Sequence, residues 1–241
     1  MVGTVRSNLP AVLFALSAAL FAQAVSAASF SVSPLRLELS AAAPIAVVEV
    51  GNASTEPVTV QAQSRTWTQR NGEDEYGEGR PFIVSPTIFT IPAGGRQVVR
   101  VALRGAPPRD VEAAYRLVMT EIPPAQPESA PGLRVALRMD MAVYVSPQQP
   151  GAQPDASFAL DLSTGTPRIA VKNSGKAHFR MVDVAVSSGA SLLAELPVLV
   201  VLPGATRYID LPKAKADGLR EFGVKADSNA GPIDLIVRHA P

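Results

Sequence analysis

Apolar side chains alternate with other residues over positions 133–145, and no other feature constrains the fold of this chain as much. The apolar positions are Leu133, Val135, Leu137, Met139, Met141, Val143 and Val145. A period of two over this length predicts one β-strand with an apolar face and a partly charged face. Strands usually run about five or six residues, so this one is expected to outrun its own sandwich. Part of its apolar face then needs another partner.

The rest of the chain also predicts β structure. Short runs rich in Val, Leu, Ile and Thr are separated by Pro and Gly at spacings near ten residues, a pattern typical of an all-β sandwich. Proline is frequent, at 22 of 241 residues, and much of it falls between these runs. No amphipathic helical period of useful length is present. The residues alone therefore predict an all-β fold.

The apolar runs divide the chain into two β regions. Strands are expected over 30–39, where Pro34 marks an edge or a bulge, and over 45–50, 58–68, 83–85, 88–91, 97–103 and 112–122. The polar stretch 71–79 predicts a loop or a hairpin tip. Three prolines between residues 146 and 154 indicate a linker. We expect an N-terminal domain at 29–147, a linker at 148–155 and a smaller second domain at 156–241.

The first 28 residues have the layout of a secretory signal peptide. Arg6 precedes an apolar run at 11–25, and small residues follow, which predicts cleavage after Ala27 or Ala28. An uncleaved anchor is the alternative, but the run is shorter than the roughly 20 residues that a spanning helix needs. No later segment is apolar enough to span a bilayer, so stable membrane insertion is not expected.

Charge and cysteine usage exclude several classes of protein. The leader holds one of the 22 basic residues and none of the 21 acidic ones, so the mature chain has a net charge of zero with His neutral. Nucleic acid is not an expected partner, because phosphate binding needs a clustered excess of Lys and Arg. Cysteine is absent, which excludes a disulfide framework. The domains are therefore expected to be stabilised by their apolar cores.

Candidate catalytic and metal sites are poor. His178 and His239 are the only histidines, so a catalytic triad or a multi-histidine metal site is not expected. We expect His178 to be a structural or surface residue. The acidic tip at 73–78 could bind calcium, but its spacing is not that of a known calcium loop, and a solvated hairpin tip is expected instead. We therefore expect no cofactor and no enzymatic activity.

Several motifs occur together in the first half. They are Ser85-Pro86-x-x-Phe89-x-Ile91, Gln97-x-x-Arg100-x-x-Leu103, Glu112-Ala-Ala-Tyr115-Arg116, Glu121-Ile122-Pro123-Pro124 and Tyr144-Val145-Ser146-Pro147. In combination they resemble the periplasmic chaperones of the chaperone/usher pathway, which assemble surface pili in Gram-negative bacteria. Trp67-x-Gln69-x-Asn71-Gly72-x-Asp74-x-Tyr76 resembles the archaic branch of that family. In the second half the resemblance is weaker and rests on Val171-x-Asn173-x-Gly175-x-x-His178 and Val201-Leu202-Pro203-Gly204.

The resemblance implies two immunoglobulin-like sandwiches set at an angle, with a cleft between them. It also implies pilus (fimbrium) biogenesis and cell wall organisation in the periplasm, with pilus subunits and an outer-membrane usher as partners. Such a chaperone lends its alternating strand to a subunit whose sandwich lacks one. By position, the inserted residues are Leu133, Val135 and Leu137, with Met139 as a fourth candidate. The alternative is that this strand belongs wholly to the chain's own core.

The same resemblance implies two charged sites. In relatives, an Arg on the first strand and a Lys on the long strand hold the subunit's terminal carboxylate. Arg36 stands at the first position, but the Lys position is Ala142, so Arg138 or Arg116 is the candidate second cation. Pairing of Arg36 with Glu38, or exposure to solvent, is the alternative. Glu112 matches an acidic interdomain residue, although its usual basic partner is Ser146 here.

Two other classes of function stay open from the residues. One is a secreted structural or adhesive β-sandwich, such as a pilus subunit or a carbohydrate-binding module, although one Trp and four Tyr provide few aromatic rings for sugar stacking. The other is a hydrolase, for which no nucleophile and base pair is identifiable. A free chaperone with an exposed apolar strand could also protect that strand by self-association.

Overall fold

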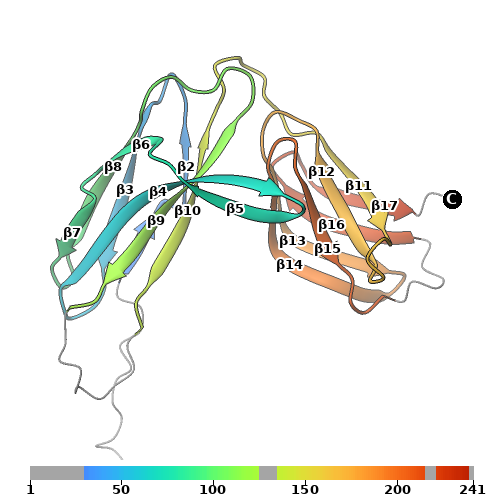
Figure 1. The fold of residues 1–241 in the computed structure, drawn as a ribbon. Coiled ribbons are helices and arrows are strands. Elements are labelled where there is room, and N and C mark those ends of the chain that lie inside the picture. Colours follow the sequence, from blue (N-terminus) through green and yellow to red (C-terminus); the bar gives the residue numbers. More distant parts are fainter. Residues whose placement is uncertain (1–29, 125–134, 215–220, 239–241) are drawn as a thin grey trace, which may run out of the picture.

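All regular structure in the described part of this chain is β-strand. The structure is a computed structural model that describes residues 30–124, 135–214 and 221–238. Its strands form two sandwich domains that meet at an angle (Figure 1). No helix that could cross a membrane occurs in these ranges. The predicted all-β, two-sandwich fold is confirmed, whereas the predicted signal peptide lies outside the described residues.

The first domain packs two sheets face to face. One sheet has the order β1 (Phe30–Ser33), β3 (Ile45–Asn52), β8 (Arg96–Leu103) and β6 (Phe82–Ser85). The other has the order β2 (Arg36–Leu39), β10 (Arg138–Val145), β9 (Ala113–Ile122), β4 (Val58–Arg70) and β5 (Glu73–Glu78), with β7 (Ile88–Ile91) also paired to β4. β2 runs parallel to β10, and the other pairs are antiparallel.

The second domain is a smaller sandwich of the same kind. A three-stranded sheet has the order β11 (Ala156–Asp161), β12 (Arg168–Asn173) and β15 (Thr206–Asp210). It packs on a sheet with the order β14 (Ser191–Val201), β13 (Phe179–Ser188), β16 (Glu221–Ser228) and β17 (Ile233–Arg238). The core lies between the two sheets, and it also includes Trp67, Ala114 and Tyr144 of the first domain.

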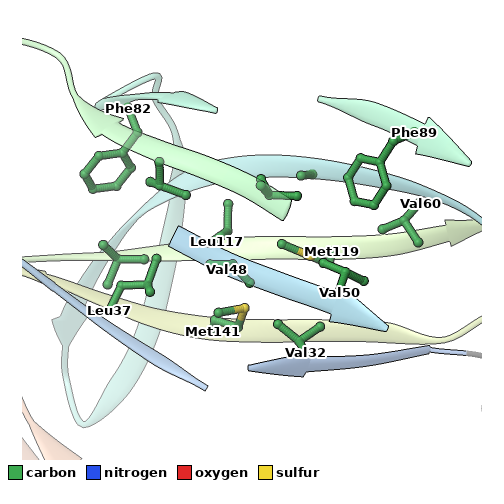
Figure 2. Close-up of a cluster of buried hydrophobic side chains, with 14 of the residues drawn as sticks. Val32, Leu37, Val48, Val50, Val60, Phe82, Phe89, Leu117, Met119 and Met141 are labelled. Carbon is green, nitrogen blue, oxygen red and sulfur yellow. The ribbon is translucent and has the colours of Figure 1, made fainter. Parts of the chain in front are cut away.

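Alternating side chains from both sheets fill the core of the first domain (Figure 2). Val48, Val50, Leu117 and Met119 are among the buried residues, and each exposes none of its surface. A side chain of this size contributes about 1.5 to 3 kcal/mol when it leaves water. Because the chain has no disulfide, this burial is the main source of stability.

The segment 30–39 is two strands rather than one. At Pro34 the chain crosses from the first sheet to the second, so β1 pairs with β3 and β2 pairs with β10. The expected polar tip is a hairpin, in which β4 and β5 are joined by the turn Asn71-Gly72. Both turn residues have positive φ, 52° and 85°, as a tight two-residue hairpin turn requires.

The long alternating strand is shorter than predicted. β10 begins at Arg138, residues 135–137 precede it without strand assignment, and Leu133 lies outside the described residues. Its partner strand explains the difference, because β9 ends at Ile122 and the next two residues, Pro123-Pro124, have no N–H to donate. Leu137 still accepts a bond from the Glu121 N–H at 2.9 Å.

β10 therefore combines a buried half and an exposed half. The core of the first domain includes Met141, Val143 and Val145. This half of the strand therefore fits the alternative that the strand belongs to the chain's own core. Leu137 and Met139 are only partly buried against that core, and Val135 is 79% exposed.

This contrast predicts different effects of truncation along one segment. We expect Met141→Ala to lower the free energy of unfolding by about 2 to 5 kcal/mol, because it opens a cavity in the core. Val135→Ala is expected to change it by less than about 0.5 kcal/mol. Urea denaturation of both variants measures the difference. A loss of the same size for Val135→Ala would mean that residue 135 is packed in the native protein.

Candidate functional site

The first half of β10 has a free edge. β2 pairs with β10 only from Ala142 to Val145, where Ala142 is opposite Arg36. Residues 138–141 pair with β9 on one side, and no described strand pairs with them on the other. The crossing at Pro34 causes this, since the chain before Arg36 belongs to the opposite sheet. Backbone donors and acceptors along this half are thus open to an added strand.

Side chains at this edge alternate as an inserted strand requires. Val135, Leu137 and Met139 share one parity, and their burial decreases toward Val135 with distance from the core. Leu133, the first predicted donor residue, lies outside the described residues.

A row of cations crosses the outer face of the same sheet. The registers place Arg36 beside Ala142, Ala142 beside Arg116, and Arg116 beside Arg65. Residues in register on neighbouring strands point to one face. Ala142, the position at which the family resemblance implies a Lys, is thus a small residue between two arginines.

The two candidate second cations differ in position. Arg138 pairs with Asp140 at 3.2 Å and lies four residues along β10 from Ala142, about 13 Å away at 3.3 Å per residue. Arg116 is in the row, and its guanidinium carbon lies 3.7 Å from the centre of the Trp67 ring. Its Nε atom is buried without a hydrogen-bond partner among the described residues. The geometry brings Arg116, and not Arg138, next to Ala142.

Arg36 itself has a nearby acid. Its Nη2 lies 3.1 Å from Glu38 Oε1, and both side chains are about half exposed. The alternative that Arg36 pairs with Glu38 is therefore observed. An exposed pair of this kind contributes about 0 to 1 kcal/mol, so a buried carboxylate from a partner could displace Glu38 at small cost.

The hydroxyl of Tyr144 is surrounded by these charges. Burial raises its pKa to about 12, and the nearby Glu112 also raises it, while Arg116, Arg36 and Arg180 act in the opposite direction. Arg180 comes from β13 of the second domain. Sequence reasoning did not identify it, because its approach to Tyr144 depends on how the domains meet.

Glu112 and His178 join the two domains. Glu112 Oε1 lies 2.8 Å from His178 Nδ1 and accepts the His178 backbone N–H at 2.9 Å, with both side chains less than 10% exposed. The His178 ring stacks on Tyr144 with centroids 3.6 Å apart. Glu112 thus contacts the second domain through His178, whereas Ser146 bonds to Leu39. His178, expected to be structural or on the surface, is a buried interdomain residue.

The β4–β5 hairpin makes a second interdomain contact. Gln69 donates its amide N–H to the Val200 carbonyl at 2.9 Å and accepts the Leu202 N–H at 2.8 Å. Asp74 accepts the Trp67 ring N–H at 2.8 Å and lies 3.3 Å from Arg207 of β15. Figure 1 shows this hairpin reaching from the first domain to the second. The archaic-like motif at 67–76 therefore holds the domains together.

Metal binding has no support in the described ranges. They contain no group of three His, Asp or Glu side chains that could hold an ion. In the acidic tip, Asp74 is bonded as described above and Glu75 pairs with Arg70 at 3.5 Å.

The fold and this site define a class of two-domain, all-β proteins in which half of one strand, residues 138–141, has an open edge. The family described as pili and flagellar-assembly chaperone, PapD N-terminal domain, matches residues 29–150. The match covers half of the chain, so the chain belongs to this family. Comparison with the curated proteins finds no match.

Solved structures of similar fold support the two-domain architecture. A chain of the CsuC–CsuE chaperone–tip adhesion subunit pre-assembly complex from the archaic Csu pili of Acinetobacter baumannii is 18% identical, with a TM-score of 0.69 over 89% of this chain and 100% of that one. A chain of the Salmonella enterica SafA pilin–SafB chaperone complex is 17% identical, with a TM-score of 0.63 over 87% and 96%. The Pseudomonas aeruginosa CupB2 chaperone is 17% identical, with a TM-score of 0.59 over 87% and 100%.

A substitution at Gly72 tests the contact between the β4–β5 hairpin and Tyr208 of the second domain. A Cβ there would lie 2.5 Å from a ring carbon of Tyr208 in β15. We expect Gly72→Ala to lower stability and to change the interdomain angle, measured by urea denaturation and small-angle X-ray scattering. Gly94→Ala is the matched control, because Gly94 also has positive φ, 66°, but open space around it. Equal losses in the two variants would mean that the tip contact contributes nothing.

The raised pKa of Tyr144 predicts a loss of stability at high pH. The ordinary pKa of 10.0 applies to the unfolded chain, and the folded value is about 12. The unfolded state therefore loses its proton first, so stability is complete below pH 10 and falls by about 2 to 3 kcal/mol by pH 12. Burial also raises the pKa of Tyr115. Tyr144→Phe should remove only the part due to Tyr144, and unchanged pH dependence in this variant would contradict the assignment.

Proposed function

We propose that this protein is a periplasmic chaperone that stabilises pilus subunits and delivers them to an outer-membrane usher. It would donate the segment 133–139 to the incomplete sandwich of a subunit. The solved complexes pair related folds with a tip adhesion subunit and with a pilin, which supports subunits as partners. The predicted leader supports export to the periplasm. No step of this role breaks a covalent bond, so we propose no catalytic activity.

The observation that carries the proposal is the one-sided pairing of residues 138–141. Proteins usually cover or charge a sheet edge to prevent unwanted pairing. Here the edge continues directly into Val135, which is 79% exposed. A subunit that lacks a strand would pair its own backbone with this edge and receive the alternating side chains.

Burial of the donor side chains would supply much of the binding energy. Val135, which is exposed, would contribute about 1.5 to 3 kcal/mol if it became fully buried in the subunit. Leu137 and Met139 are already partly buried, so each would contribute less. In the free protein a second copy could cover the same edge. Sedimentation velocity over a range of concentrations tests self-association, and a strict monomer would remove it.

The cation row would orient the bound subunit. We propose that Arg36 and Arg116 hold the terminal carboxylate of the subunit on either side of Ala142. A guanidinium binds a carboxylate through two parallel hydrogen bonds and fixes its direction. This would set which subunit residues face Val135 and Leu137, since a strand shifted by one residue presents its other face.

Capture of a subunit tests the proposal. The chain is co-expressed in the periplasm with the pilus-subunit-like protein encoded beside its gene, and affinity capture is compared for wild type, Val135→Asp and Val47→Asp. Val47 is the matched control, an exposed valine on the outer face of the other sheet. We expect Val135→Asp to lose capture and Val47→Asp to retain it, with both variants folded by circular dichroism. Equal capture by Val135→Asp would refute strand donation through this segment.

The arginine row has a separate test. Arg36→Ala and Arg116→Ala are each expected to weaken capture by about tenfold or more, because a buried carboxylate would lose a charged partner. Arg109→Ala serves as the control, since Arg109 is exposed and lies outside both the row and β10, and Arg138→Ala tests the other candidate cation. Extending the subunit by several residues, which moves its terminal carboxylate away from the arginines, should remove the difference between these variants. A larger effect of Arg138→Ala would assign the second cation to that residue instead.

A further inference from the structure

A polar groove of about 730 Å³ lies beside β4 in the first domain. Its walls come from the middle of β4, the end of β5, β6, the start of β7 and the residue after β8. It continues over the outer face of β9 and ends at Arg138, the first residue of β10. The groove therefore reaches the strand proposed as the donor.

Its lining is strongly cationic. Arg65, Arg80, Arg104 and Arg138 contribute to it, and Glu78 is the one acid among the lining residues. Arg138 is paired with Asp140. Arg65, Arg80 and Arg104 make no ion pair or side-chain hydrogen bond with any other described residue. Glu78 is opposite Arg65 in the β4–β5 register, so the four arginines of the lining exceed its acids. Such an excess of like charge attracts an anionic ligand, and low salt strengthens the attraction.

The backbone of β4 is open at the same place. On this side of the strand, β7 pairs as far as Gln61 and β5 pairs from Arg65 onward. In the gap, the Ala62 N–H bonds to the Thr87 carbonyl at 2.8 Å, and the Ser64 hydroxyl bonds to the Gly79 carbonyl at 3.4 Å. Gln63 and Ser64 have strand partners only on β9 within the described chain. Because the Ala62 N–H points to the β7 side, Ser64 is the one of these two whose backbone groups face the groove. An extended peptide could bond to this short edge.

Apolar side chains complete the lining. Ile83 and Ile88 also contribute to the groove and are 52% and 55% exposed. Free phosphate would use the arginines but neither the isoleucines nor the backbone edge. A peptide that alternates acidic and apolar residues would use all three, because its successive side chains point to opposite sides.

We propose that this groove binds an acidic, extended segment of the same subunit that β10 holds. The inference rests on the proposed function, and the continuity of the groove with Arg138 argues for the subunit as the source. The groove would be a second contact, separate from the donor strand and from the carboxylate site. Its arginines would select subunits that carry acidic residues at this distance from the donated strand.

A labelled octapeptide that alternates Glu with Val and Thr tests the groove directly on the mature chain. By fluorescence anisotropy at low salt, we expect Arg80→Glu with Arg104→Glu to weaken binding by at least about tenfold. Arg109→Glu with Lys172→Glu makes the same change in net charge at exposed sites outside the groove and should bind like wild type. The same peptide with Gln for Glu should bind poorly. Wild-type affinity in the groove variant, or equal binding of the Gln peptide, would overturn the proposal.

Capture of the co-expressed subunit identifies the source of the segment. The groove variant should still capture the subunit through β10, but the complex should dissociate about tenfold faster than that of the control variant. Val135→Asp should lose capture and keep peptide binding. If the groove variant binds no peptide yet releases the subunit at the wild-type rate, the subunit is not the occupant and the proposal fails. If Val135→Asp captures the subunit normally, strand donation fails while the peptide result stands.

Discussion

The parallel pairing of β2 with the second half of β10 is the constraint on which the rest of this structure depends. It fixes residues 142–145 between two strands, so that Val143 and Val145 complete the core of the first domain. It also directs Tyr144 to the second domain. Because β2 starts only at Arg36, the same pairing leaves residues 138–141 with one neighbour. One strand thus holds the protein together at one end and remains available at the other.

The two domains are joined by side chains and not only by the chain between them. The interface between the domains has two separate parts. In one, Tyr144 stacks on His178. In the other, Gln69 bonds to Val200 of β14 and to Leu202. Such hydrogen bonds need defined geometry, because a buried polar group that loses its hydrogen-bond partner destabilises the protein by about 1 to 3 kcal/mol. A joint built this way favours one interdomain angle. The cations from β2, β9 and β13 then keep fixed positions around the Tyr144 hydroxyl.

Local sequence signals predicted most of the strands but few of their partners. The alternation at 141, 143 and 145 depends on neighbouring residues and is present as predicted. The stretch 71–79 is predicted as a loop or a hairpin tip, and the hairpin turn is confined to Asn71-Gly72, because residues 73–78 form β5. The start of β10 could not be read from its own pattern, because it depends on Pro123-Pro124 after the partner strand. His178 gains its role from Glu112, 66 positions away, and Arg180 acts on Tyr144 across the interface between the domains. Sequence patterns carry little information about such contacts without a resemblance to guide them.

The substitution of Ala for the family Lys is consistent with the position of Arg116. Ala142 lies on β10 between β2 and β9, and the Arg116 guanidinium lies against Trp67 of β4. Arginine keeps its charge in such a place and offers several fixed donors, whereas lysine is a point charge on a flexible chain. The Arg116 Nε has no hydrogen-bond partner among the described residues, which costs free energy in the unbound protein. A carboxylate bound nearby would favour the charged, oriented guanidinium, so binding would recover part of that cost. In the proposed complex, an arginine reaching from the neighbouring strand would then perform the task that relatives assign to the missing lysine.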